Sequence, residues 1–197
     1  MGIIVASGVA LASGTLAAST SHWWGGRTNP GPRVKWGVLI VVWFIGTLGY
    51  LVDPQWQLWN DGFVALGCVV AVVDALDRII PNRLVLLTAL WALGWGALPW
   101  MHWIMALETG LGIFLFYLIV HVVTHGGLGM GDVKYGGALG LALGWPAGLT
   151  AMAAGVWAAA IYAVYLLVFR NKKRTDSIAL GPFLALGGII GILELIH

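Results

Sequence analysis

The sequence predicts an all-α, polytopic integral membrane protein of about eight transmembrane helices, with both termini on the outer side. Three observations support this fold class. Hydrophobic residues make up 60% of the 197 residues and charged residues only 9%, whereas about a quarter of an average soluble domain is charged. The apolar residues gather in runs long enough to cross a bilayer. The basic residues fall in every second loop between these runs.

Eight apolar segments are expected to form helices, because a backbone in lipid must satisfy its own hydrogen bonds. They lie at residues 2–19, 36–52, 62–76, 84–98, 104–123, 135–145, 149–169 and 178–196. The first run is alternatively a signal peptide, but no basic residue precedes its apolar stretch, which favours a retained span. The sixth run ends early, at Trp145–Pro146. Without it, however, the basic cluster at 170–174 would lie outside.

Lysine and arginine set the orientation, since basic loops stay in the cytoplasm. All ten basic residues follow the first, third, fifth and seventh spans. Residues 20–35 are then a short cytoplasmic loop. The outer boundary carries an aromatic belt of Trp56, Trp59, Trp100, Trp103 and Trp145. We expect residues 1–197 to form one membrane domain in contact with lipid.

Composition excludes several classes of protein. So few charged side chains cannot cover the surface of a soluble enzyme, and a disordered chain would contain far fewer apolar residues. A net charge of +2 is too small to indicate a nucleic-acid partner. The single cysteine, Cys68, excludes an internal disulfide and a cysteine-rich zinc module.

Three acidic residues stand out because a charged group within an apolar span costs about 2.5–3.5 kcal/mol on insertion scales. Asp74 and Asp77 lie near the inner end of the third span, and Asp132 precedes the sixth. The topology places Asp74 and Asp132 at the same depth. The other acidic residues are interpreted as loop residues (Asp53, Asp61 and Asp176) or as residues that reach the outer interface (Glu108 and Glu194).

Two carboxyl groups at one depth, on different helices, can form an aspartyl dyad. One acts as general base on a water, while the other, protonated, polarises the scissile carbonyl; close like charges favour a shared proton. Structural alternatives exist for each residue. Asp74 or Asp77 can pair with Arg78, and Asp132 can cap a helix that starts near Tyr135.

Three motifs together resemble the type IV prepilin peptidases. Residues 74–82, DALDRIIPN, are similar to the family's D-x5-[IL]-P-[ND] segment. Residues 129–134, GMGDVK, look like its G-x-G-D-V-K motif, and residues 181–187, GPFLALG, are similar to its G-P-F-L-A-x-G segment. The three occur in family order over about residues 64–188.

The resemblance implies a hydrolase: an intramembrane aspartyl protease of the G-x-G-D type, with Asp74 and Asp132 as the catalytic pair. Its substrates would be type IV prepilins or pseudopilins, of pilus, competence or secretion systems. It would remove their leader peptides at the cytoplasmic boundary of the inner (plasma) membrane, without a cofactor or metal. Many bacterial members also N-methylate the mature pilin and carry a large cytoplasmic loop with paired C-x-x-C motifs. Residues 20–35 contain no cysteine, so this is a short form for which methyl transfer is left open.

The residues around the two aspartates also have a physical interpretation. Gly129 and Gly131 let backbone or substrate approach Asp132 closely. Pro81 requires a turn after the third span, and Asn82 can cap the fourth.

Two further motif residues each have two interpretations. Lys134 either biases the dyad toward one negative charge or anchors the chain as a positive-inside residue. Pro182 either frees backbone groups for an extended substrate or is an ordinary membrane-helix proline.

Competing functions are less well supported. His121 and His125 have the spacing of a zinc-protease helix but Val where the general-base Glu belongs, so we predict no metal site. A proton-coupled transporter would also use intramembrane aspartates, but the sequence shows no inverted repeat. A purely structural subunit of a secretion machine would leave the aspartate pair unexplained.

Overall fold

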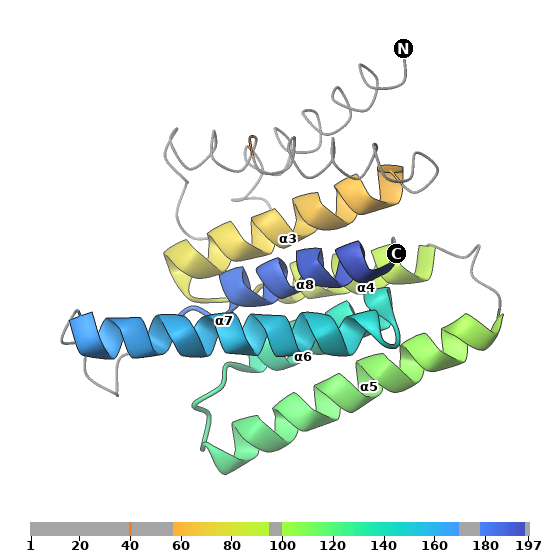
Figure 1. The fold of residues 1–197 in the computed structure, drawn as a ribbon. Helices are drawn as coiled ribbons and strands as arrows, with labels where there is room; N and C mark the ends of the chain where they lie inside the picture. The colour runs from red at the N-terminus through yellow and green to blue at the C-terminus, as the bar shows by residue number, and fades with distance from the viewer. Residues whose placement is uncertain (1–39, 41–56, 95–99, 170–177, 196–197) are drawn as a thin grey trace.

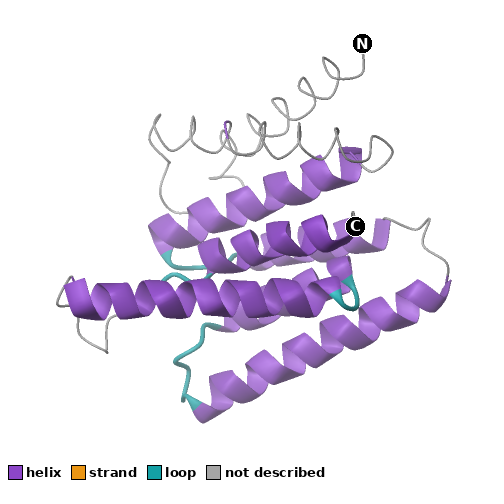
Figure 2. Ribbon diagram, viewed as in Figure 1, coloured by secondary structure: helices purple, strands orange, loops and turns teal. Residues whose placement is uncertain are grey.

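The computed structural model describes residues 57–94, 100–169 and 178–195, together with residue 40, and these ranges form helices without a strand (Figures 1 and 2). The helices are α3 (Gln57–Asp77), α4 (Asn82–Gly94), α5 (Trp100–Val123), α6 (Met130–Leu143), α7 (Ala147–Phe169) and α8 (Gly181–Leu195). Several predictions lie outside the described residues: the spans at 2–19 and 36–52, the loop at 20–35, Asp53, Trp56, the cluster at 170–174 and Asp176. The side chains of Trp59, Asp61 and Trp100 lie outside them too.

Consecutive helices run in opposite directions. In Figure 1, α3, α5 and α7 run toward one end of the bundle, and α4, α6 and α8 run back from it. We call this end the motif end, because residues 74–82, 129–134 and 181–187 lie there. Within the bundle, α6 contacts α4, α5, α7 and α8, whereas α3 packs against α8 and α4. The predicted all-helical class is therefore confirmed for the described part of the chain.

The turn between α3 and α4 lies where the proline predicted it. Arg78 adopts a left-handed φ of 53°, which ends the helix, and its amide donates to the carbonyl of Asp74 (2.8 Å). The chain then passes through Ile79 and Ile80 to Pro81. The Pro81 carbonyl accepts hydrogen bonds from Leu84 (3.0 Å) and Val85 (3.3 Å) and so opens α4.

The start of α6 corrects the sequence prediction. The helix begins at Met130 rather than Tyr135, with Gly129 as an extended N-cap. Asp132 therefore lies within the first turn of α6 and not before it, so the idea that it caps a helix starting near Tyr135 is wrong. Glycine is a poor helix former, which hid this turn from the sequence pattern. Packing against four other helices stabilises this first turn, which the glycine-rich local sequence does not favour.

Small residues bring the helices close together, as is usual between membrane helices. A Cβ at Gly187 of α8 would overlap the carbonyl of Ala151 on α7, and one at Gly155 would lie 2.9 Å from the Phe183 carbonyl oxygen. At the α5–α6 interface, a Cβ at Gly110 would lie 2.9 Å from the amide nitrogen of Leu141. Glycine and alanine residues therefore allow the close packing of these helices.

Two of the described helices are long and apolar enough to cross a membrane, Trp103–Val123 and Ala147–Phe169. Their outward faces carry large exposed apolar side chains, such as Trp157 and Phe169 at about 70% exposure. An apolar surface this extensive requires a nonaqueous environment. The fold is that of a membrane protein.

Candidate active site

Asp74 is buried at the end of α3 and is held by the start of α8. The residue is 4% exposed, and its Oδ2 accepts a hydrogen bond from the Gly181 amide (2.7 Å). The first N–H groups of a helix have no partner within the helix, so the carboxyl satisfies one of them. This bond joins the first and third motifs across 107 residues of sequence.

Asp132 lies at the same end of the bundle as Asp74, in the first turn of α6. Its Oδ2 faces Gly129, whose amide donates a hydrogen bond back to the carboxyl group. This is the side-chain half of a capping box. Its Oδ1 is buried and has no hydrogen-bond partner among the described residues. The carboxyl groups of Asp132 and Asp74 are close enough for their charges to interact, so the structure brings the two predicted aspartates together.

Two further contacts join the first and second motifs. Lys134 Nζ donates to Asn82 Oδ1 (3.0 Å). A Cβ at Gly131 would lie 3.0 Å from the Ile80 Cβ and 3.2 Å from its carbonyl oxygen, so α6 rests directly on the turn that follows Asp74. These contacts fix the depth of Asp132 relative to Asp74.

The remaining predicted residues lie at the same end. Asn82 is the first residue of α4, and its side chain bonds to Lys134 instead of opening the helix as its cap. Pro81 is half-buried in the turn before it. Pro182 is the second residue of α8 and is also half-buried. It follows the glycine amide that binds Asp74.

The two histidines have separate structural positions. His121 Nδ1 donates to the carbonyl of Leu128 (2.6 Å) and so braces the loop that leads into Gly129. His125 lies in that loop with φ 50° and is exposed. Among the described residues, no three His, Cys, Asp or Glu side chains are grouped as a metal site would need.

Tyr117 was not anticipated from the sequence. It is 2% exposed on α5, its hydroxyl is buried without a hydrogen-bond partner in the described ranges, and it interacts electrostatically with Asp132. Tyr117 is one of several aromatic residues in the long apolar helix α5. The sequence feature that relates to its position is Gly136, which faces its ring.

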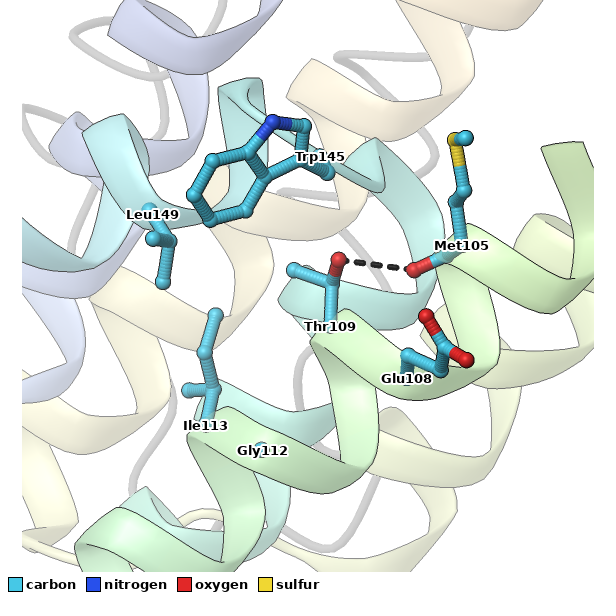
Figure 3. Close-up of a pocket in the computed structure, with 7 residues that line it drawn as sticks. All are labelled: Met105, Glu108, Thr109, Gly112, Ile113, Trp145 and Leu149. Atoms are coloured by element: carbon cyan, nitrogen blue, oxygen red, sulfur yellow. Dashed lines mark hydrogen bonds between the residues drawn. The ribbon is translucent and has the colours of Figure 1, made fainter.

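A pocket of about 380 Å³ lies near the other end of the bundle (Figure 3). It is lined by Met105, Glu108, Thr109, Gly112, Ile113, Trp145 and Leu149. The Thr109 hydroxyl is occupied by the Met105 carbonyl (2.7 Å), and Glu108 is exposed. No motif residue lines this pocket. A second, more open groove of about 360 Å³ between α4, α5 and α6 includes Lys134.

Comparison with known sequences identifies the family. Residues 62–164 match the type IV leader peptidase family. The chain belongs to this family. The matched region includes both aspartates and the G-x-G-D motif, whereas the GPFLALG motif follows it. The predicted resemblance is confirmed.

Relatives named prepilin leader peptidase/N-methyltransferase align with the chain. The protein of Aeromonas salmonicida (strain A449) is 30% identical over 188 residues, which cover 93% of this chain and 55% of that protein. The protein of Bacillus subtilis (strain 168) is 29% identical over 132 residues, which cover 66% of this chain and 53% of that protein. The chain thus spans about half the length of these relatives. No solved structure matches it.

Proposed function

We propose that this type IV leader peptidase family member is an intramembrane aspartyl endopeptidase, in which Asp74 and Asp132 form the catalytic dyad. The observation that carries the proposal is their juxtaposition. Two carboxyl groups from separate helices lie close enough to interact, and each accepts a hydrogen bond from a motif glycine amide, Gly181 or Gly129.

The chemistry follows from two adjacent carboxyl groups that share one proton. The ionised carboxylate takes a proton from water, and the oxygen of that water attacks the scissile carbonyl carbon. The protonated carboxyl donates a hydrogen bond to the carbonyl oxygen as negative charge develops there. As the tetrahedral intermediate collapses and the C–N bond breaks, the carboxyl group that took the water proton donates it to the leaving amine nitrogen, which restores the pair with one shared proton. General acid–base catalysis of this kind contributes about 10²–10⁴-fold.

Oδ1 of Asp132 can accept a further hydrogen bond during this cycle. Oδ2 of Asp74 and Oδ2 of Asp132 both face motif glycines, whereas Oδ1 of Asp132 has no partner among the described residues. Lys134 and Asn82 hold α6 against the turn after Asp74, and Pro81, Gly131 and Pro182 shape the surrounding backbone. No cofactor enters this mechanism.

The substrates in this proposal are prepilins or pseudopilins, with a short basic leader followed by an apolar helix that stays in the membrane. The names of the aligned relatives support this substrate class. The alternating basic loops support eight spans, outer termini and a motif end on the cytoplasmic side of the inner membrane. The alternating directions of the described helices agree with that plan. We confine the proposal to leader cleavage.

The test separates the dyad from its neighbour Asp77. Asp→Asn nearly preserves size but cannot accept the proton of the attacking water. Asp74→Asn and Asp132→Asn should each abolish leader cleavage of a co-expressed prepilin while the protein still accumulates in the membrane. Asp77→Asn should stay within about tenfold of wild type, or about 1.4 kcal/mol in the barrier.

Two results would contradict the assignment. If Asp77→Asn is inactive and Asp74→Asn is active, the first catalytic aspartate is one helical turn away. If all three variants cleave the prepilin, the protein is not an aspartyl protease of this kind, and aspartates that relay protons for transport become the better explanation.

A further inference from the structure

Two buried polar atoms, one on α5 and one in the dyad itself on α6, lack a hydrogen-bond partner in the part of the chain that the structure describes. They are the hydroxyl of Tyr117 and Oδ1 of Asp132, and neither makes a hydrogen bond to a described residue. Leaving such an atom unsatisfied costs about 1–3 kcal/mol. Unsatisfied buried groups are rare in native proteins, and a functional role is one of the recognised reasons for them.

The helix packing directs Tyr117 toward Asp132. Its ring packs on Gly136, where a Cβ would overlap ring atoms Cδ2 and Cε2. Gly136 lies four residues after Asp132, and residues at this spacing share one face of a helix. The missing side chain at 136 therefore admits the tyrosine ring to the face of α6 that carries the aspartate. The two groups are close enough to interact electrostatically.

The chemistry of the two atoms is complementary. A phenol O–H is a hydrogen-bond donor, and a carboxyl oxygen is an acceptor. The Gly129 amide already binds this carboxyl group, and its Oδ2 faces that glycine. Oδ1 is the oxygen that a second donor would hold, and Tyr117 is a donor with no other partner among the described residues.

We propose that Tyr117 is a positioning residue whose hydroxyl donates to Oδ1 of Asp132 during the cleavage cycle. With Gly129 on one oxygen and Tyr117 on the other, the carboxyl plane is fixed relative to Asp74 and the scissile bond. The proposal rests on the proposed aspartyl protease function. It assigns no contact with substrate to Tyr117, so its effect should appear in the chemical step and not in binding.

The experiment removes only the hydroxyl. Tyr117→Phe keeps the ring on Gly136, and Tyr135→Phe is the matched control. Tyr135 is 1% exposed on α6, but its hydroxyl lies toward Gly67 of α3. With purified full-length protein and a synthetic prepilin, Tyr117→Phe should lower kcat by about 10- to 100-fold, the range for a hydrogen bond to a charged group. KM should change by less than about twofold, and Tyr135→Phe should match wild type.

The outcomes separate this proposal from the function on which it rests. If wild type does not cleave prepilin, or Asp132→Asn does, the protease assignment fails. If wild type cleaves prepilin and Asp132→Asn does not, the protease assignment is supported. The Tyr117→Phe result then tests only the positioning role of Tyr117. Wild-type kcat in Tyr117→Phe would overturn the positioning role. So would an effect confined to KM, an equal loss in Tyr135→Phe, or failure of Tyr117→Phe to accumulate as folded protein. Recovery of kcat with 3-fluorotyrosine at position 117, which restores the hydroxyl, would support the role.

Discussion

At Gly181 the absence of a side chain brings α8 onto Asp74. A Cβ at this position would lie 2.8 Å from both Cβ and Oδ2 of Asp74, closer than nonbonded atoms approach. Because the Gly181 amide also donates to Oδ2, α8 cannot retreat without losing that hydrogen bond. The carboxyl group therefore has to move if any larger residue replaces this glycine.

Gly181→Ala should reduce leader cleavage by at least about tenfold, which corresponds to about 1.4 kcal/mol in the barrier. The physical reason is displacement of Asp74 and loss or lengthening of its bond to the α8 amide. Gly112→Ala is the control, since a Cβ at Gly112 on α5 has no neighbour within 4 Å. Prepilin cleavage per unit of folded protein is the measurement. Equal activities of the two variants would show that Asp74 tolerates the added methyl group.

The residue-level contacts of the site were only partly predictable from sequence. The apolar spans and basic loops can be recognised from each segment of sequence alone, and they already place Asp74 and Asp132 at one depth. The hydrogen bond between Gly181 and Asp74 joins positions 107 residues apart, and the sequence around either residue does not predict it. Tyr117 was missed for a similar reason, since its orientation depends on the face of α6 that packs against it.

Among the elements, α6 departs most from prediction, and its neighbours explain the difference. Its sequence, MGDVKYGGALGLAL, is rich in glycine, and glycine in a helix interior costs about 1 kcal/mol relative to alanine. Pattern reasoning therefore started the helix at Tyr135, where the apolar run begins. In the structure α6 packs against four other helices. The glycines that weaken it as an isolated helix allow that packing.

The interface of α7 and α8 provides a prediction about stability. In an exposed helix, Gly→Ala is stabilising by up to about 1 kcal/mol. At Gly187 the sign should reverse, because the new Cβ would overlap the Ala151 carbonyl, and overpacking costs about 1–3 kcal/mol. Thermal unfolding in detergent should show a lower Tm for Gly187→Ala than for wild type. Gly112→Ala should unfold at or above the wild-type temperature. A Gly187→Ala protein at least as stable as wild type would show that α7 and α8 can separate freely.

For the whole molecule, the alternating helix directions are the strongest agreement between sequence and structure. Lysine and arginine predict that every second loop faces the cytoplasm. In Figure 1 the turns after α3 and α5 lie at the motif end, whereas the turn between α6 and α7 lies at the other end. The helix bounds differ by a few residues, as with α4, which begins at Asn82 against a predicted 84. The first and last turns of a helix depend on capping residues and on packing against other helices, which the hydrophobicity of the sequence does not predict.

The membrane orientation can be tested with single cysteines in a Cys68→Ala background. Arg78→Cys, Met130→Cys (next to Gly131) and Lys172→Cys should be shielded from impermeant thiol reagents in intact cells. Gln55→Cys and His102→Cys should be labelled, because they lie on the opposite, outer side in the eight-span plan. All five should react after permeabilisation, which controls for burial. External labelling of Met130→Cys would reverse the orientation and place the aspartates on the wrong side for leader cleavage.

The unequal lengths of the helices have a consequence for the water that the proposed hydrolysis would consume. With 14 residues in α6 and 23 in α7, a rise of 1.5 Å per residue gives lengths of about 21 Å and 35 Å, against a hydrocarbon layer of about 30 Å. At the motif end α7 extends well past the start of α6 (Figure 1). Asp132, in the first turn of α6, therefore sits below the level that α7 reaches. In the proposed mechanism each peptide bond cut there would consume one water molecule, which would have to reach Asp132 from the aqueous surface. Water would then be a reactant that has to be supplied to this position.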